Sequence, residues 1–430
     1  MINSANLRFS AALGLLLVAF LAIHWSPFQP VATYAFVFVS TSLVFLFLAR
    51  QLFSSEPSPR VVSIAVAVAL LVRLSFINLS PIGSDDVYRY MWEGKTQSHG
   101  VNPYLYSPDA PQLDSLHTEL LPAAVNHPDM KTVYFPFSQW IFYGCYQLSG
   151  ESIWGYKLVL FAADFATLIG LLSLLRRLNI PSKFALLYLL CPLPIIQFAL
   201  DAHIDAVGLP LLIFGLLAYL RGNKALSYVL FALSISVKPV AVLILPILFL
   251  REKGIRHKAQ VAMVPSIVVV GQFLPYVFSS NPFEGLTRFA ENWTFNGVVF
   301  ETLYLWFSDN QKTRMVCAIL LCISLLLLYM RKKEPLDAFY FSVLLLLMFS
   351  PVVHPWYVSW LAVLLPFARR WSGIVYASFV SFSVYTIVNY KLHGNWNQSA
   401  LILALEYVPV IALMFLELLR SERKPLEGNA

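Results

Sequence analysis

The chain has 430 residues, of which 58% are hydrophobic and 12% are charged, about half the charged share of an ordinary globular protein. So few polar side chains cannot cover the surface of a soluble fold of this size, which excludes a soluble or disordered protein and predicts an all-α polytopic membrane protein. The formal net charge is +7, but the 30 Lys and Arg residues are spread between apolar runs. No cluster among them could form a nucleic-acid groove, so no nucleic-acid partner is expected.

Ten apolar runs come near the length of roughly 17 to 25 residues that a helix needs to cross a bilayer. They cover residues 8–25, 31–49, 61–79, 156–175, 184–200, 207–220, 259–278, 315–330, 372–388 and 400–418. The first run is not followed by a small-residue cleavage site, so it is interpreted as a span and not as a signal peptide.

Two longer apolar stretches, 225–250 and 337–368, are interrupted by proline. The first is interrupted at Lys238-Pro239, and the second at Ser350-Pro351 and His354-Pro355. Each predicts two short helices that meet at a polar break. The total is about 12 to 14 membrane helices, in a single integral membrane domain that covers residues 1–430.

Positive charges predict the orientation. If the N-terminus is cytoplasmic, 20 of the 30 Lys and Arg residues fall in inner segments, where such residues are retained. We therefore expect both termini in the cytoplasm and the chain in the cell's inner (cytoplasmic) membrane. Counting the run 133–148 as a span would invert every later loop, so it is predicted to be an interfacial helix. Two large outer loops remain, at 80–155 and 279–314, and long loops are often functional.

The first outer loop begins with adjacent carboxylates, Asp85 and Asp86, in the string GSDDVYRYMWEG at 83–94. Adjacent carboxylates at a membrane boundary repel each other, which favours a protonated carboxyl or a neighbouring cation. A partly desolvated member of the pair is a candidate general base. A helix N-cap is an equally good interpretation of the same two residues.

Three further strings in the loop, GVNPY at 100–104, NHPD at 126–129 and YFPF at 134–137, place aromatic and amide groups among prolines. Sugars stack on rings and bond to amides, so these strings are candidates for a sugar platform. Ordinary turn chemistry is the alternative.

Polar groups also lie within or beside the apolar runs, where they are costly unless they serve a site. They form the segment DAHID at 201–205, Lys238 at one helix break, and HPWY at 354–357 at the other. A buried Lys238 ammonium needs an anion, such as a lipid phosphate or one of the carboxylates. Zinc binding is an alternative role for the 201–205 segment, but the sequence shows no second group of ligands for the metal. Arg73 and Asp164 are expected to pair with each other or to snorkel.

In this order, the strings GSDDVYRYMWEG, GVNPY, NHPD, YFPF, DAHIDA, SVKP at 236–239 and HPWY resemble the GT-C superfamily of polyprenyl-phosphate-sugar-dependent glycosyltransferases. The resemblance spans about residues 60 to 370 and is greatest to the bacterial mannosyltransferase branch. It implies a GT-C-like fold and a catalytic acid in the first large outer loop. With Arg89-Tyr90 as anchor, that acid falls on Asp86, with Asp85 as the reserve. The chain has Val87 where those relatives have a second acid.

The implied reaction moves a hexose, mannose by family, from a polyprenyl-phosphate donor to an envelope glycolipid or glycan hydroxyl at the extracytoplasmic side, with inversion. Asp86 takes the proton of the acceptor hydroxyl, and Lys238, His354 and Arg89 stabilise the departing phosphate. The expected sugar and acceptor contacts are Asn102, Tyr104, His127, Tyr134, Asp201, His203, Asp205, Trp356 and Tyr357. Because the leaving group is a single phosphate, fixed cations suffice, and neither a metal nor a cofactor is expected.

A secondary transporter or lipid-linked-sugar flippase is the main alternative, because transporters also place polar residues at broken helices. The chain shows no internal repeat of the kind that such transporters have. A non-catalytic subunit of an envelope-polysaccharide assembly is a third possibility, and it would tolerate loss of the two carboxylates.

Overall fold

The computed structural model describes residues 4–25, 29–331 and 333–420, and within them the chain is an all-α membrane protein. The only pairing of extended backbone in these ranges is a pair of isolated bridges from Phe295 and Asn296 to Val352. Within a bilayer a helix satisfies its own backbone hydrogen bonds, which is why apolar runs of this length become helices.

Six helices in the described ranges are long and apolar enough to cross a membrane. They are α1 (Ser4–Trp25), α2 (Pro30–Ser54), α6 (Ile153–Arg177), α15 (Asn310–Met330), α19 to α20 (Trp371–His393) and α21 (Ala400–Arg420). A seventh span results if the bent pair Ser182–Leu189 and Pro192–Leu200 is counted as one. The number of full-length spans is thus lower than the 12 to 14 membrane helices predicted, because several apolar runs fold into shorter pieces.

The shorter pieces lie between these spans. They include α3 (Pro59–Ser75), α9 (Asp205–Leu220), α10 (Lys224–Val237), η4 (Pro239–Leu243), α11 (Ile244–Arg251), α12 (Ile255–Gly271), α14 (Val298–Phe307), α16 (Pro335–Phe349), α17 (Pro355–Ala362) and α18 (Leu365–Ala368). Both predicted breaks are confirmed: α10 ends one residue before Lys238, and α16 and α17 are separated by residues 350–354. The bend of 50° at Cys191-Pro192 was not predicted.

Helices distant in sequence pack together in the bundle. α9 packs against both α6 and α10, and α19 packs against α2 and α21. The expected pairing of Arg73 with Asp164 is confirmed: the Arg73 Nε donates to Asp164 Oδ2 at 2.6 Å, with both side chains buried. This ion pair joins α3 to α6, so it is part of the packing.

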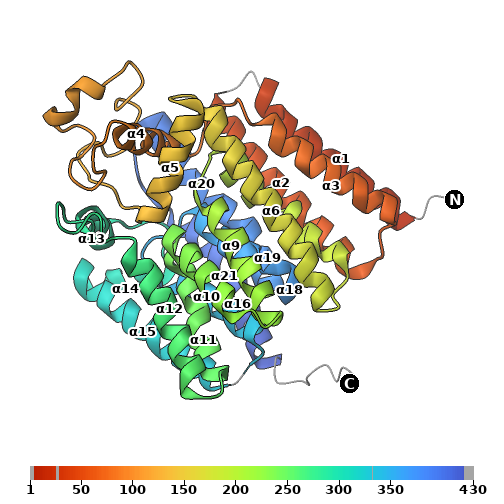
Figure 1. The fold of residues 1–430 in the computed structure, drawn as a ribbon. Coiled ribbons are helices and arrows are strands. Elements are labelled where there is room, and N and C mark those ends of the chain that lie inside the picture. The colour runs from red at the N-terminus through yellow and green to blue at the C-terminus, as the bar shows by residue number, and fades with distance from the viewer. Residues whose placement is uncertain (1–3, 26–28, 332, 421–430) are drawn as a thin grey trace.

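The segments of the two predicted outer loops gather at one end of the bundle (Figure 1). There lie α4 (Asp86–Ser98), η1 (Pro111–Leu116), α5 (Pro136–Ser149) and α13 (Glu284–Asn292). Ion pairs between Lys131 and Glu284 and between Asp129 and Arg288 join the loops to each other. At 14 residues, α5 is too short to be one of the candidate spans, and its interfacial position stays a prediction.

Candidate active site

Asp201 anchors the backbone that leads into α4. Its Oδ1 accepts hydrogen bonds from the backbone N–H groups of Ile82, at 3.0 Å, and Gly83, at 2.9 Å, and its Oδ2 accepts one from the Tyr34 hydroxyl. A side chain at position 83 would not fit, since a Cβ there would lie 2.3 Å from the Tyr34 hydroxyl oxygen. Asp201 therefore positions the first turn of α4.

Asp86 stands at the first position of α4 and faces the interior of the site. Its Oδ1 accepts a hydrogen bond of 2.8 Å from the Asn126 side-chain amide, and its Oδ2 lies 3.5 Å from Nδ1 of His203. Burial by itself raises the pKa of the Asp86 carboxyl, but His203 and the Asn126 amide outweigh burial, so the pKa lies well below its usual range. The carboxyl is consequently ionised and acceptor-only near neutral pH.

Asp85 occupies a different environment, although it is the next residue. Its side chain is 48% exposed, compared with 19% for Asp86, and its Oδ1 lies 3.4 Å from Nζ of Lys391 in α20 (Val384–His393). Asp85 stands at the N-cap position of α4, yet its side chain makes no capping hydrogen bond. The two carboxylates therefore point to separate partners.

A stack of rings continues from Asp86 into the site. The ring of Trp356 lies between the imidazoles of His203, at a centroid distance of 3.7 Å, and His354, at 4.2 Å. The other face of His354 stacks on Phe295 at 4.7 Å. Neither ring nitrogen of His203 has a hydrogen-bond partner within the described residues, although both are buried. Buried polar atoms normally have a partner. Nδ1 faces the Asp86 carboxylate, so Nε2 is the ring nitrogen of His203 that is available to a bound ligand.

Lys238 supplies the cation of the site. It follows the last residue of α10, with its Nζ 3.9 Å from the ring centroid of Tyr357 and 3.8 Å from Oδ1 of Asp205. The latter distance exceeds a normal hydrogen bond. Asp205 is itself held by the Trp360 indole N–H, which donates to the same oxygen at 2.7 Å. The Lys238 side chain is 21% exposed, so the ammonium can reach a ligand.

His354 lies near both charges of the site, Asp86 and Lys238. Burial lowers the pKa of the His354 imidazole well below its usual value, and the Lys238 charge lowers it further, while Asp86 acts in the opposite sense. The imidazole is therefore neutral near pH 7, and it can donate a hydrogen bond without carrying a positive charge.

Arg89 lies on the next turn of α4, with its guanidinium occupied by the protein. It donates to the backbone carbonyl oxygens of Asn126 and His127, both at 2.7 Å, and of Met130 at 3.0 Å. These bonds hold the loop that carries the Asn126 amide against α4. Arg89 therefore supports the site by holding this loop in position.

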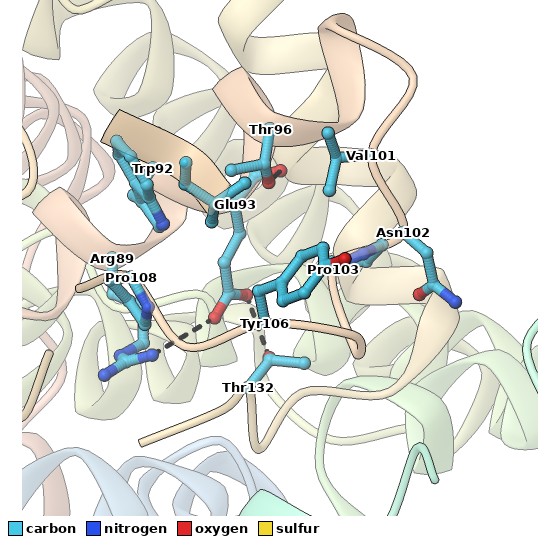
Figure 2. A pocket seen from close by; sticks show the side chains of 11 residues that line it. Arg89, Trp92, Glu93, Thr96, Val101, Asn102, Pro103, Tyr106, Pro108 and Thr132 are labelled. Atoms are coloured by element: carbon cyan, nitrogen blue, oxygen red, sulfur yellow. Dashed lines mark hydrogen bonds and ion pairs between the residues drawn. The ribbon is translucent and has the colours of Figure 1, made fainter. Parts of the chain in front are cut away.

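Figure 2 shows a small cavity behind this support, lined by Arg89, Glu93 and Thr132 among others. Glu93 lies 3.6 Å from Arg89 and accepts hydrogen bonds from the Thr132 hydroxyl and the Gln139 amide. The cavity measures about 10 Å³, close to the minimum for one water molecule. It is part of the packing that holds α4 and has no room for a substrate.

The remaining predicted contacts join loops to each other. The Asn102 amide donates to the hydroxyls of Ser279 and Ser280, and the Tyr104 hydroxyl donates to the carbonyl oxygen of Tyr134. The His127 ring packs edge-on against Trp293 of the second outer loop, at 4.7 Å.

Tyr134 packs against α4 and α5. Its ring packs edge-on against Tyr90, at 5.3 Å, and against Phe142, at 5.2 Å.

Of the residues predicted from the sequence, the structure brings seven into one cluster: Asp86, His203, Asp205, Lys238, His354, Trp356 and Tyr357.

Sequence reasoning missed several residues that shape the site. Asn126 stands in the string NHPD, in which the sequence predicts His127 as the sugar or acceptor contact. Tyr34, which lies within α2, donates a hydrogen bond to Asp201. The sequence feature that could have indicated its role is a phenol inside an apolar run. Phe295 and Trp360 gave no signal, because an aromatic residue in or near an apolar stretch is usually packing.

The comparisons with known proteins agree with this picture. The family model described as alpha-(1->6)-mannopyranosyltransferase, N-terminal domain, matches residues 7–252, and the MptB C-terminal domain matches residues 311–420. Neither a curated protein nor a solved structure matches the chain. The first match covers more than half of the chain and includes Asp86, His203 and Lys238, which confirms the resemblance to GT-C-like mannosyltransferases. The chain therefore belongs to the alpha-(1->6)-mannopyranosyltransferase family and is a glycosyltransferase that moves mannosyl groups.

Proposed function

We propose that this mannosyltransferase takes mannose from a polyprenyl-phosphate donor and transfers it to a hydroxyl of an envelope glycolipid or glycan on the extracytoplasmic side of the inner membrane. The observation that carries the proposal is one cluster of contacting side chains that holds a carboxylate and a cation. Asp86 lies beside His203, which stacks on Trp356 and, through it, on His354. The Lys238 ammonium lies over the Tyr357 ring, which packs edge-on against His354. Displacement at a sugar phosphate needs a base for the incoming hydroxyl and a cation for the departing phosphate.

Asp86 is the base in this proposal. The acceptor hydroxyl donates its proton to a carboxylate oxygen as the hydroxyl oxygen attacks the anomeric carbon of mannose. Asn126 and His203 hold that carboxylate in place. Asp85 is turned toward Lys391, so Asp86 remains the first choice and Asp85 has no part in the proton transfer.

Lys238 balances the charge that develops on the phosphate as the anomeric bond breaks. His354, being neutral, contributes a hydrogen bond. Arg89 was expected among the phosphate ligands, but its bonds to three backbone carbonyls favour a supporting role. The phosphate then leaves as the polyprenyl monophosphate, with the lipid chain between helices of the bundle.

The stereochemistry follows from the opposite placement of base and leaving group. Attack in line with the breaking bond inverts the anomeric carbon. Because the family name specifies an alpha linkage, inversion requires a donor in which mannose is β-linked to phosphate.

The test uses the purified full chain in detergent, radiolabelled polyprenyl-phosphate mannose in both anomeric forms, and a soluble alkyl α-(1→6)-dimannoside as acceptor. We expect label from the β-linked donor alone to reach the dimannoside. Transfer without a gradient separates an enzyme from a transporter. Asp86→Asn should lower kcat roughly 10²- to 10⁴-fold, the usual contribution of a general base.

Asp85→Asn is the matched control, since it removes a neighbouring carboxylate of the same size. Its kcat should stay within a few-fold of that of the unmodified enzyme. Full activity in Asp86→Asn, or an equal loss in both variants, contradicts the assignment of the base.

A further inference from the structure

The segment 394–399 joins α20 to α21, and with the last turn of α20 it forms a strap, residues 391–398, beside the candidate active site. Its first residue, Lys391, lies 3.4 Å from the carboxylate of Asp85. At its other end, the side-chain oxygen of Gln398 accepts a hydrogen bond of 2.7 Å from the backbone N–H of Asn296. The strap is thus attached to the start of α4 at one end and to the second outer loop at the other.

Trp396, in the middle of the strap, is held in place without being covered. Its ring lies 5.3 Å from Phe295 and 5.3 Å from Tyr390, which packs edge-on against it. Even so, 44% of Trp396 is exposed. An aromatic ring that is already ordered loses little conformational freedom when a ligand stacks on it.

The neighbours of Trp396 on both sides carry exposed amides. Asn395 and Asn397 are exposed, and their side chains make no hydrogen bond within the part of the chain that the structure describes. Each amide offers two donors and one acceptor oxygen. A hydroxyl group, which both donates and accepts, is a matching partner for such a pair.

We propose that the strap binds the acceptor, a neutral, hydroxyl-rich saccharide that stacks on Trp396 and bonds to Asn395 and Asn397. This inference rests on the proposed function, because it assigns the second substrate of the same reaction. The charges favour a neutral ligand over an anionic one, because the Lys391 ammonium is already paired with Asp85. The same pair places the strap beside the residue that precedes Asp86, where an acceptor hydroxyl has to arrive.

An exposed tryptophan in a membrane protein has another common role, as an anchor in the headgroup layer. An anchor contributes to stability in a membrane but makes no difference to the affinity for a soluble acceptor. The two roles are therefore separated by the steady-state constants measured with the soluble dimannoside.

The experiment compares Trp396→Ala and Trp396→Phe with the unmodified chain in detergent. We expect Trp396→Ala to raise the KM for the dimannoside about tenfold or more, the scale of a lost aromatic contact, while the KM for the donor and kcat stay within about twofold. Trp396→Phe should recover most of the affinity. Trp306→Ala removes a tryptophan that is 84% exposed on α14, and it should leave all three constants unchanged.

Other outcomes overturn the inference. An unchanged acceptor KM in Trp396→Ala assigns the ring to the membrane surface, and an equal change in kcat and in the KM values of both substrates assigns it to packing. If Trp396→Ala does not fold, the double variant Asn395→Ala with Asn397→Ala decides, because these exposed side chains hold nothing together. It should raise the acceptor KM several-fold, and an unchanged value refutes the site. Absence of transfer by the unmodified chain refutes the proposed function instead.

Discussion

Asn126 sets the properties of Asp86 through one hydrogen bond, from its amide to the carboxylate oxygen, at 2.8 Å. This bond is made to the charged form of Asp86, so it lowers the pKa of the carboxyl. The amide is in turn placed by Arg89, which holds the backbone carbonyl of Asn126 at 2.7 Å. The ionisation of Asp86, the proposed base, therefore depends on Asn126 and, through it, on Arg89.

Replacing Asn126 by Ala should therefore shift the acid limb of the pH profile of kcat/KM to higher pH. Loss of the hydrogen bond raises the pKa of Asp86, so the carboxylate becomes protonated, and inactive as a base, at a higher pH than in the unmodified enzyme. The measurement is kcat/KM for mannosyl transfer across the acidic range.

The control is Asn102→Ala, which removes an amide of the same loop that bonds to Ser279 and Ser280 instead. Its acid limb should not move. An acid limb that stays in place in Asn126→Ala, or that moves to lower pH, contradicts the role of the hydrogen bond.

At the level of elements, α21 holds the segment around Asn296, in the second predicted outer loop, beside the candidate site. The buried Glu406 accepts a hydrogen bond of 2.9 Å from the Asn296 side chain, and the Tyr407 hydroxyl donates to the Asn296 carbonyl at 2.7 Å. The preceding residue, Phe295, stacks on His354. A helix at the C-terminal end of the chain thereby positions an imidazole that lies about fifty residues earlier in sequence.

Glu406→Leu should lower both the unfolding temperature and kcat. Without the carboxyl oxygen the buried Asn296 amide loses its acceptor, which costs about 1–3 kcal/mol, and Phe295 is no longer held against His354. Glu406→Gln keeps an acceptor oxygen in the same place and should remain close to the unmodified enzyme in both quantities. Thermal unfolding and initial rates in detergent measure the effects, and a leucine variant with unaltered stability and rate would refute this coupling.

At the level of the whole molecule, the distribution of Lys and Arg predicts that the active site and the termini lie on opposite sides of the membrane. Two thirds of these residues fall in the segments predicted to be inner, and such residues stay cytoplasmic. The loops that carry Asp86 and α13 lie together at one end of the bundle (Figure 1).

Labelling of single cysteines in intact cells with a membrane-impermeant maleimide tests this orientation. The starting chain carries Cys322→Ser, because Cys145, Cys191 and Cys317 are buried and Cys322 is exposed. Ser115→Cys, in η1, should be labelled from outside. Ser182→Cys is the matched control: it is also exposed, lies in a segment predicted to be inner and should react only after the cells are opened. The reverse pattern would place the site in the cytoplasm.

Part of this architecture could be predicted because its causes are local. Proline cannot continue a helix, so the breaks at Lys238-Pro239 and before Pro355 followed from the sequence. The number of full-length spans did not follow from the sequence, because the length of an apolar run does not show where tertiary contacts end a helix. The bend at Cys191-Pro192 lies inside one such run.

The amino-acid sequence by itself determined the class of the molecule, the helix breaks and the family, because apolar content, proline and motif order are properties of short stretches of chain. Only the tertiary structure gave Asp86 and Asp85 different partners, turned Arg89 inward and placed Lys238 beside Asp205. Those outcomes depend on contacts between side chains that are up to 306 positions apart in the chain, as for Asp85 and Lys391, and packing of the whole bundle decides which of them meet.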